Sequence, residues 1–494
     1  MVVFRPARAR SILLIAFALI LVCTVYLYWT PTSASSTVSL VPSTAFEVPL
    51  VERQKDFWKV IHPILERHNP NCTAPKKLND AGAVGFERVS DDMPRPDLTT
   101  LSEEDQKTME EAHANFVEDI KQLQEKNALK SAHTPGKRGL VSTAGGTYLP
   151  VFVNSLRMLR RAGSTLPVEV FMKDASEFEK QICNEVLPEL DARCLVLGDV
   201  LGGKDANGKD PISHYQLKIF AVLFSSFEDI VWMDADTFPL GKPEDLLDAE
   251  PFTSSGLVTW PDFWVSSASP LYYKISRQEA PPMSARQSSE TGAFLVSKKT
   301  HMLPLLLAAY YNLYGPSHYF RLLSQGAPGE GDKETFLQAA TAVGASYYAV
   351  SEKVQAIGHQ NGAKLSGSAM AQSDPREDSV HRSDPSAPVS HVFFIHANYP
   401  KFNPGEKVFG LAWETKPTLK EDGSDGRAWT APPDTIQRFG YDVEKNYWDE
   451  IKWVTCNLQF KSWEKKAGLC QKVEDYWKNV FAEPHDDDPK FETV

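Results

Sequence analysis

This sequence lacks an excess of positive charge. Its 494 residues include 52 Lys and Arg against 64 Asp and Glu, which gives a formal net charge of -12. Proteins that bind along nucleic acid need clustered cations facing the phosphates, so we expect no nucleic-acid partner. An anionic ligand would have to be held locally, by a metal ion, by backbone amides or by a few placed cations.

Cysteine is also scarce, and none of the six has the spacing of a zinc site. Cys23 falls in an N-terminal apolar run. Among the others, Cys183 with Cys194 and Cys456 with Cys470 are close enough in sequence to pair, although several pairings are open. Internal repeats and a dinucleotide-binding fingerprint are absent as well.

The N-terminus carries one long hydrophobic run. Residues 11–29 contain no charged side chain, and about 20 apolar residues suffice for a helix to cross a bilayer. Arg5, Arg8 and Arg10 precede the run, so the positive-inside rule puts the N-terminus in the cytosol and the rest in a lumen. A cleaved signal peptide is the alternative, and both interpretations send the chain into the secretory pathway.

The remaining sequence divides by composition. From about residue 139, short apolar strands such as 168–172 and 229–233 alternate with helices, which predicts an α/β fold with a mostly parallel sheet. Residues 366–391 are rich in Ser, Asp, Pro and Gly and are expected to form a mobile loop. We expect five parts: a cytoplasmic tail (1–10), a transmembrane signal anchor (11–29), a lumenal stem and helical arm (30–135), a catalytic domain (136–415) and a C-terminal helical extension (416–494).

Two carboxylates follow the apolar strand that ends at Met233. Asp234 and Asp236 are one residue apart at a turn, so both could reach one divalent cation. Such a cation can bridge a diphosphate and stabilise its departure. The alternative is a solvated polar turn.

Other polar residues lie near expected strand ends. Lys218 sits inside the apolar helix HYQLKIFAVLF and needs either an anion or a route to solvent. His396 follows a late strand and could be a third metal ligand or simply structural. Gly145 and Gly146 follow the first strand, where they could admit a nucleotide or form a plain turn.

Two more carboxylates are candidates for contact with a sugar. Glu290 is expected just before a strand. Asp332 opens a helix and is either its N-cap or a partner for sugar hydroxyls. Trp260 could stack on a sugar ring, with core packing as the alternative.

Several blocks of sequence together resemble one family, the fungal Golgi α-mannosyltransferases that extend mannan and N-glycan branches. They occur in the family's order: GLVSTAGGTYLPVFVNSLRMLRRAGSTLPVEVF, HYQLKIFAVLFSSFEDIVWMDADTFPL, ETGAFLVSK, GEGDKETF, GSAMAQSDP and FIHANYPKFNP. The similarity spans about residues 139–415 and is greatest to the α-1,2 branch.

The resemblance implies a GT-A-like fold, a GDP-mannose donor, Mn²⁺ or another divalent cation, and retention of configuration at a mannan or N-glycan α-1,6-mannose backbone. It also implies a single-pass type II Golgi membrane protein, with a mannosyltransferase complex as an expected partner. On this basis Asp234, Asp236 and His396 bind the metal, and Lys218 approaches the diphosphate. Glu290 and Asp332 would lie near the transferred sugar or the acceptor.

Three alternatives stay open. An α-1,3-mannosyltransferase is the near neighbour in the family, and a UDP-sugar-dependent Golgi transferase would keep the same fold. A lumenal scaffold subunit of a mannan-synthesising complex is the non-enzymatic alternative, although the intact carboxylate pair with Lys218 and His396 speaks against it.

Overall fold

The computed structural model divides the chain into two units, residues 1–48 and 49–494, of which the second is compact. It describes residues 49–202, 212–409, 415–485 and 488–491. The expected tail and anchor fall outside this part of the chain. Among the described residues, no helix is both long enough and apolar enough to cross a membrane.

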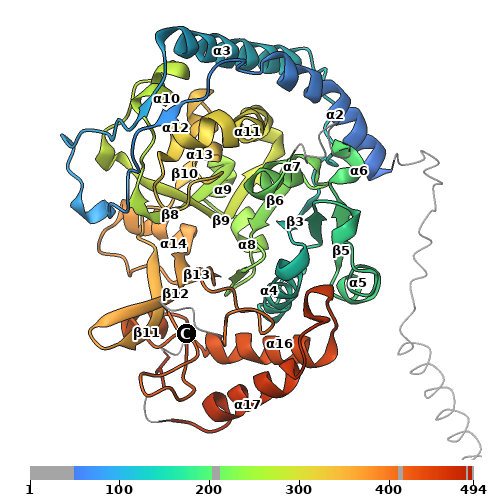
Figure 1. Cartoon of the computed structure of the whole chain (residues 1–494), viewed down its shortest axis with the longest axis vertical. Coiled ribbons are helices and arrows are strands. Elements are labelled where there is room, and N and C mark those ends of the chain that lie inside the picture. The colour runs from blue at the N-terminus through green and yellow to red at the C-terminus, as the bar shows by residue number, and fades with distance from the viewer. Residues whose placement is uncertain (1–48, 203–211, 410–414, 486–487, 492–494) are drawn as a thin grey trace, which may run out of the picture. The chain divides into compact units, whose positions relative to one another are not determined.

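The centre of the second unit is a seven-stranded mixed sheet in the order β10-β8-β9-β6-β3-β4-β5 (Figure 1). Strand β9 is antiparallel to both of its neighbours, and the other pairs are parallel. The expected mixed, mostly parallel sheet is therefore confirmed. Its strands are β3 (Arg138–Thr143), β4 (Val168–Met172), β5 (Ala192–Val196), β6 (Asp229–Met233), β8 (Leu257–Val265), β9 (Gln287–Ser297) and β10 (Tyr348–Ala349).

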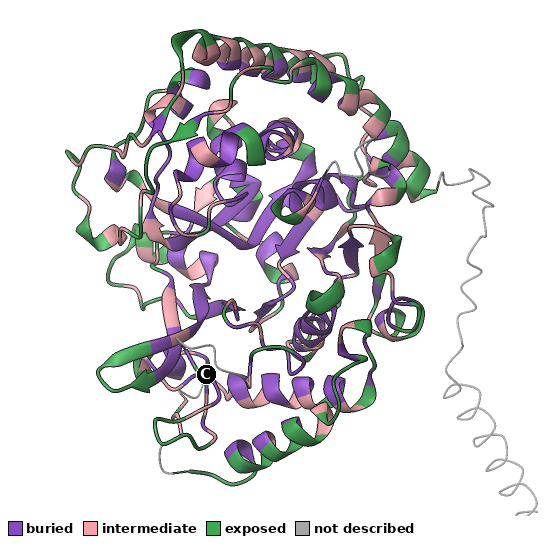
Figure 2. Cartoon of the chain, viewed as in Figure 1, coloured by how far each residue is buried: buried purple, intermediate pink, exposed green. Residues whose placement is uncertain are grey.

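Helices cover both faces of this sheet, and its strands are mostly buried except for the edge strands β5 and β10 (Figure 2). Because side chains alternate along a strand, Ile230 and Trp232 face one core while Val231 and Met233 face another. The first core includes α7 (Leu217–Phe224), α11 (Lys298–Leu313) and α13 (Thr335–Ala342), and the second includes α4 (Leu149–Arg161).

A second, antiparallel sheet has the order β11-β12-β13-β7. The expectation of a mobile loop over 366–391 is wrong, because this region contains the buried strand β12 and helix α14. Small residues such as Ser368 and Ala369 let β12 pair on both sides, but they give no apolar run. The elements are β7 (Thr237–Pro239), β11 (Gln355–Asn361), β12 (Lys364–Ser373), β13 (Val392–His396) and α14 (Pro375–Ser383).

Two long helices precede the main sheet and pack into the first core. They are α2 (Leu50–Arg67) and α3 (Glu103–Glu125), and α3 runs beside α10 (Pro270–Ile275) and α11 (Figure 1). Helix α3 lies within the expected helical arm, and the side chain of Ser102 caps it by accepting from the backbone N–H of Asp105.

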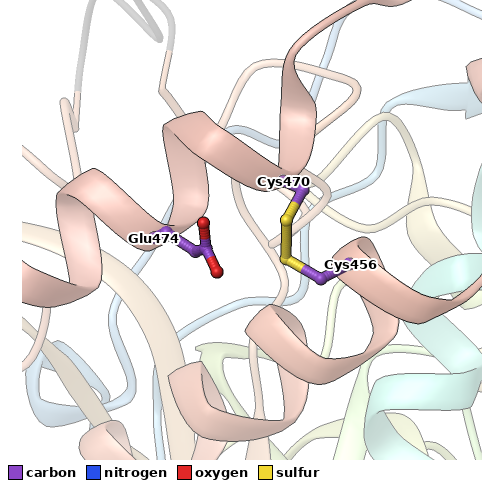
Figure 3. Close-up of side chains that lie close together, drawn as sticks. All are labelled: Cys456, Cys470 and Glu474. Carbon is purple, nitrogen blue, oxygen red and sulfur yellow. A yellow bond between two sulfur atoms is a disulfide. The ribbon is translucent and has the colours of Figure 1, made fainter.

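The C-terminal helices α15 (Pro433–Gln437), α16 (Val443–Asn457) and α17 (Leu469–Phe481) form a third core with the second sheet. A disulfide between Cys456 and Cys470 ties α16 to α17 (Figure 3). Glu474 lies close by, but both sulfur atoms are used in the disulfide. Cys183 and Cys194 form the other disulfide, so both close pairs are present.

Short elements complete the described chain. They are β1 (Lys76–Lys77), β2 (Thr99–Thr100), α5 (Leu187–Glu189), α6 (Gly198–Leu201), α8 (Glu244–Leu247), α9 (Phe252–Ser255) and α12 (Phe320–Ser324).

Candidate active site

The candidate site lies where the order of strands reverses. The chain runs outward from β3 through β4 to β5 and then returns to place β6 on the other side of β3. In an open α/β sheet, ligands bind at the carboxyl ends of the strands that flank this point. Here those ends carry Gly145 and Gly146 after β3, and Asp234 after β6.

The pair Asp234 and Asp236 is held by both sheets. The Asp234 backbone N–H donates to the Gly292 carbonyl at 2.8 Å, and the Trp232 indole donates to Asp234 Oδ1 at 2.9 Å. Asp236 is buried, and its carbonyl accepts from Ala397 N–H at 2.9 Å. Strand β7 starts one residue later, so the carboxylate pair marks the junction of the two sheets.

His396 comes to this junction from the end of β13. Its Nε2 lies 3.3 Å from Asp236 Oδ1, and its Nδ1 lies 3.2 Å from Glu290 Oε1. Burial lowers the pKa of His396, but the two carboxylates outweigh burial and raise it to about 10. One ligand atom each from Asp234, Asp236 and His396 lies within 4.8 Å of the others, so the fold brings the three expected metal ligands together.

Lys218 reaches the same cluster from α7. Its ammonium lies 3.0 Å from Asp234 Oδ1 and 3.2 Å from Asp332 Oδ2, and it donates to the Thr291 carbonyl at 2.7 Å. Burial alone would lower the pKa of Lys218, but the two carboxylates hold it above its usual value. Lys218 is therefore a buried cation with anionic partners.

The two other expected carboxylates differ in position from the predictions. Glu290 lies inside β9 instead of before it, and its Oε1 accepts from Gly292 N–H at 2.7 Å. Its buried Oε2 has no hydrogen-bond partner within the described structure. Asp332 is not an N-cap, because α13 begins at Thr335. Asp332 lies instead in the hydrogen-bonded turn before that helix, where its carbonyl accepts from Thr335 N–H at 2.8 Å and its carboxylate pairs with Lys218.

The two glycines make a turn of their own. Gly146 has φ +54°, a conformation that glycine adopts without strain. A Cβ on Gly145 would lie 2.2 Å from Glu177 Oε2, so a side chain of the protein makes the close approach there. Trp260 is buried against Phe394, which agrees with the core-packing alternative.

Lys401 and Gly292 also contribute to the site. The Lys401 ammonium pairs with Asp236 Oδ2. A Cβ on Gly292 would lie 2.4 Å from His396 Nδ1, so only glycine leaves room for the imidazole. The charged groups gathered here are four carboxylates and three bases: Asp234, Asp236, Glu290, Asp332, Lys218, Lys401 and His396. Even with His396 protonated, one negative charge is in excess.

The sequence is similar to that of known mannosyltransferases. Residues 137–287 and 282–374 match Mannosyl_trans3, a mannosyltransferase family. The chain is 31% identical to the α-1,2-mannosyltransferase MNN21 of Candida albicans, over 90% of this chain and 81% of that protein. It is 29% identical to the α-1,2-mannosyltransferase MNN2 of Saccharomyces cerevisiae, over 66% of this chain and 61% of that protein.

The chain belongs to the fungal α-1,2-mannosyltransferase family. Among solved structures, the glycosyltransferase GlyE of Streptococcus pneumoniae is similar over 43% of this chain and 45% of that chain, with 12% identity and a TM-score of 0.29. A TM-score this low does not define the fold of this chain.

Proposed function

We propose that this protein transfers mannose from GDP-mannose, in α-1,2 linkage and with retention, to an α-1,6-mannose backbone of mannan or an N-glycan. The observation that carries the proposal is the convergence of Asp234, Asp236 and His396 at the point where the strand order reverses. Family membership selects mannose as the sugar, and the names of the relatives support the linkage. The arrangement of the main sheet suits a GT-A-like enzyme.

The residues at this junction fit a divalent cation such as Mn²⁺. Ligand atoms lie about 2.0–2.6 Å from such ions, so two ligands of one ion are separated by up to about 5 Å. The 4.8 Å limit within the triad agrees with this distance. The excess negative charge and the mixed carboxylate and imidazole ligands suit the same ion. When bound, the ion would stabilise charge on the departing diphosphate.

The protein's own side chains have complementary tasks in this proposal. Lys218 pairs with Asp234 and Lys401 pairs with Asp236. Because a bound cation would take over these two carboxylates, both lysines could then turn toward phosphate oxygens. The free Oε2 of Glu290 can accept a hydrogen bond from a hydroxyl of the transferred sugar and so orient the sugar. Retention would then follow a front-face path, in which the leaving phosphate takes the proton of the acceptor hydroxyl.

We further propose a Golgi membrane location, with the second unit in the lumen and a mannosyltransferase complex as a partner. The uncharged run at residues 11–29 supports an anchor. The two disulfides support an oxidising compartment.

The test is a transfer assay on the full chain with GDP-mannose, an α-1,6-mannotriose acceptor and Mn²⁺. Asp236→Asn should lower the rate by about 10³-fold or more, while the exposed Asp97→Asn should leave it unchanged. EDTA should abolish transfer, and an α-1,2-specific mannosidase should release the added residue. If the wild type neither binds nor consumes GDP-mannose but consumes another nucleotide-sugar, the proposed donor is wrong.

A further inference from the structure

Exposed tyrosines gather on the segments that carry the candidate active site. Tyr148 follows the two glycines after β3, Tyr215 precedes α7, and Tyr399 follows His396. They are 47%, 59% and 44% exposed. Binding residues are often carried on loops that a rigid scaffold positions, and several exposed aromatic side chains gathered at one site are candidates for ligand contact.

Tyr215 is the most exposed of the three, and the residues on either side of it fix its backbone. It lies in the short helical turn His214–Gln216, where Ser213 and Gln216 form a capping box. The buried Gln216 side chain donates to the Asn312 carbonyl of α11 at 2.9 Å. His214 has φ +51°, which is an unfavourable conformation for a residue with a side chain. Such strain persists only where the surroundings impose it, often at functional sites.

The ring of Tyr215 lies beside the catalytic cluster. A Cβ on Gly331 would lie 2.9 Å from Tyr215 Cδ2, so the ring rests on the loop that leads into Asp332. Lys218 follows Tyr215 by three residues and pairs with both Asp332 and Asp234. The exposed ring is therefore joined to these buried charges through two short segments, the turn into α7 and the loop before Asp332.

The Lys218 ammonium lies on the β9 side of β6, whereas the glycine turn follows β3 on the other side. Strand β6 lies between β3 and β9 in the sheet. Gly145 and Tyr148 follow β3, whereas Lys218 reaches across to Thr291 of β9. A nucleotide in the crevice between β3 and β6 would place its diphosphate at Asp234. The transferred sugar would then lie toward β9, and the acceptor has to reach it there.

We propose that Tyr215 and the loop at Gly331 form the acceptor subsite, in which the phenol ring stacks on a neutral mannose residue of the acceptor glycan. This inference rests on the proposed function. Aromatic faces give apolar contact area to the C–H face of a sugar, and nearby polar groups fix its hydroxyls. The carboxylate of Asp332, one residue beyond Gly331, is such a group.

The experiment compares the full chain with Tyr215→Ala and Tyr215→Phe. Trp453→Ala is the matched control, since Trp453 is 40% exposed on α16, which carries no residue of the site. Acceptor KM for α-1,6-mannotriose, KM for GDP-mannose, and hydrolysis of GDP-mannose without acceptor are measured. Binding of mannotriose alone is followed by saturation-transfer NMR.

We expect Tyr215→Ala to raise the acceptor KM at least 10-fold and to abolish the mannotriose NMR signal. The GDP-mannose KM and the hydrolysis rate should stay within twofold, and Tyr215→Phe and Trp453→Ala should resemble wild type. An unchanged acceptor KM with a raised GDP-mannose KM would overturn the assignment and move Tyr215 to the donor. If wild type uses no GDP-mannose yet binds mannotriose through Tyr215, the donor proposal fails and the subsite stands. If wild type binds no mannotriose at all, the subsite is wrong.

Discussion

At the residue scale, the absence of a side chain at Gly292 fixes the position of His396. The position of Gly292 in β9 leaves no room for a methyl group beside His396, because the added Cβ would lie 2.4 Å from Nδ1 and 3.0 Å from Glu290 Oε1. Gly292→Ala should therefore displace the imidazole and lower the transfer rate by about 10²-fold or more. Gly367→Ala is the control, since its Cβ would meet no atom closer than 3.9 Å.

Activity and thermal unfolding of both glycine variants separate a local effect from a global one. Gly292→Ala should lose activity with a Tm that stays close to wild type, and Gly367→Ala should keep both. Full activity in Gly292→Ala would show that the position of His396 does not matter for transfer.

Lys218 gives a second prediction, on stability. Its ammonium is buried with Asp234 and Asp332, and removing one partner of a buried ion pair costs about 3–5 kcal/mol. Lys218→Met should lower the free energy of unfolding by that amount, measured with denaturant. Adding Asp332→Asn should recover part of the loss, because the pair is coupled. Strictly additive losses in the double variant would contradict the coupling.

At the element scale, the sequence predicts those parts of the fold in which hydrophobic patterning is strong. Strands β4 and β6 have the predicted bounds, because each is a short run of mostly apolar residues. Strand β12 was missed because its Ser, Gly and Ala residues are buried by pairing on both sides instead of by their own hydrophobicity.

The same contrast holds for the candidate site. Asp234 and His396 could be placed near each other because Asp234 follows an apolar strand and His396 ends one. The fit of Gly292 against His396 could not be predicted, since it depends on a contact between β9 and β13 that no local pattern encodes. The acceptor-binding role proposed for Tyr215 rests on its exposure, which the sequence does not give.

Helix α3 supplies a prediction of pH dependence. His113 is buried on α3, with its Nε2 2.8 Å from the Tyr311 hydroxyl of α11, and burial lowers the pKa of His113 from 6.5 to about 4. Because the unfolded chain takes up this proton at higher pH than the folded one, the stabilisation is present above pH 6.5. This stabilisation is lost as the pH falls toward 4. Between pH 7.5 and pH 5 the free energy of unfolding should fall by about 2 kcal/mol for this reason.

Denaturant unfolding at pH 7.5 and at pH 5 tests this sign. His113→Gln should show about 2 kcal/mol less pH dependence than wild type, whereas His62→Gln, at a more exposed position on α2, should match wild type. Equal pH dependence in wild type and His113→Gln would rule out His113 as the titrating group.

For the whole molecule, the packing of α2 and α3 decides where the folded unit begins. Six of their apolar side chains are at most 1% exposed and belong to the same core as α7 and α11: Phe57, Ile61, Leu65, Met109, Phe116 and Ile120. Burying one such side chain contributes about 1.5–3 kcal/mol, so the six contribute on the order of 10 kcal/mol. Total stabilities of domains are about 5–15 kcal/mol.

A chain that starts at residue 136, the expected start of the catalytic domain, should therefore not fold, whereas one that starts at residue 49 should. Without the two helices, the apolar faces of α7 and α11 would be open to water, and the loss is comparable to the entire free energy of unfolding. Thermal unfolding of secreted 49–494 should be cooperative, and 136–494 should aggregate or unfold without a transition. Supplying residues 49–135 as a separate polypeptide should restore some folded protein, because the contacts are apolar and need no covalent link. A cooperative transition for 136–494 within a few degrees of that for 49–494 would mean that the two helices are an attachment to the catalytic fold and not part of its core.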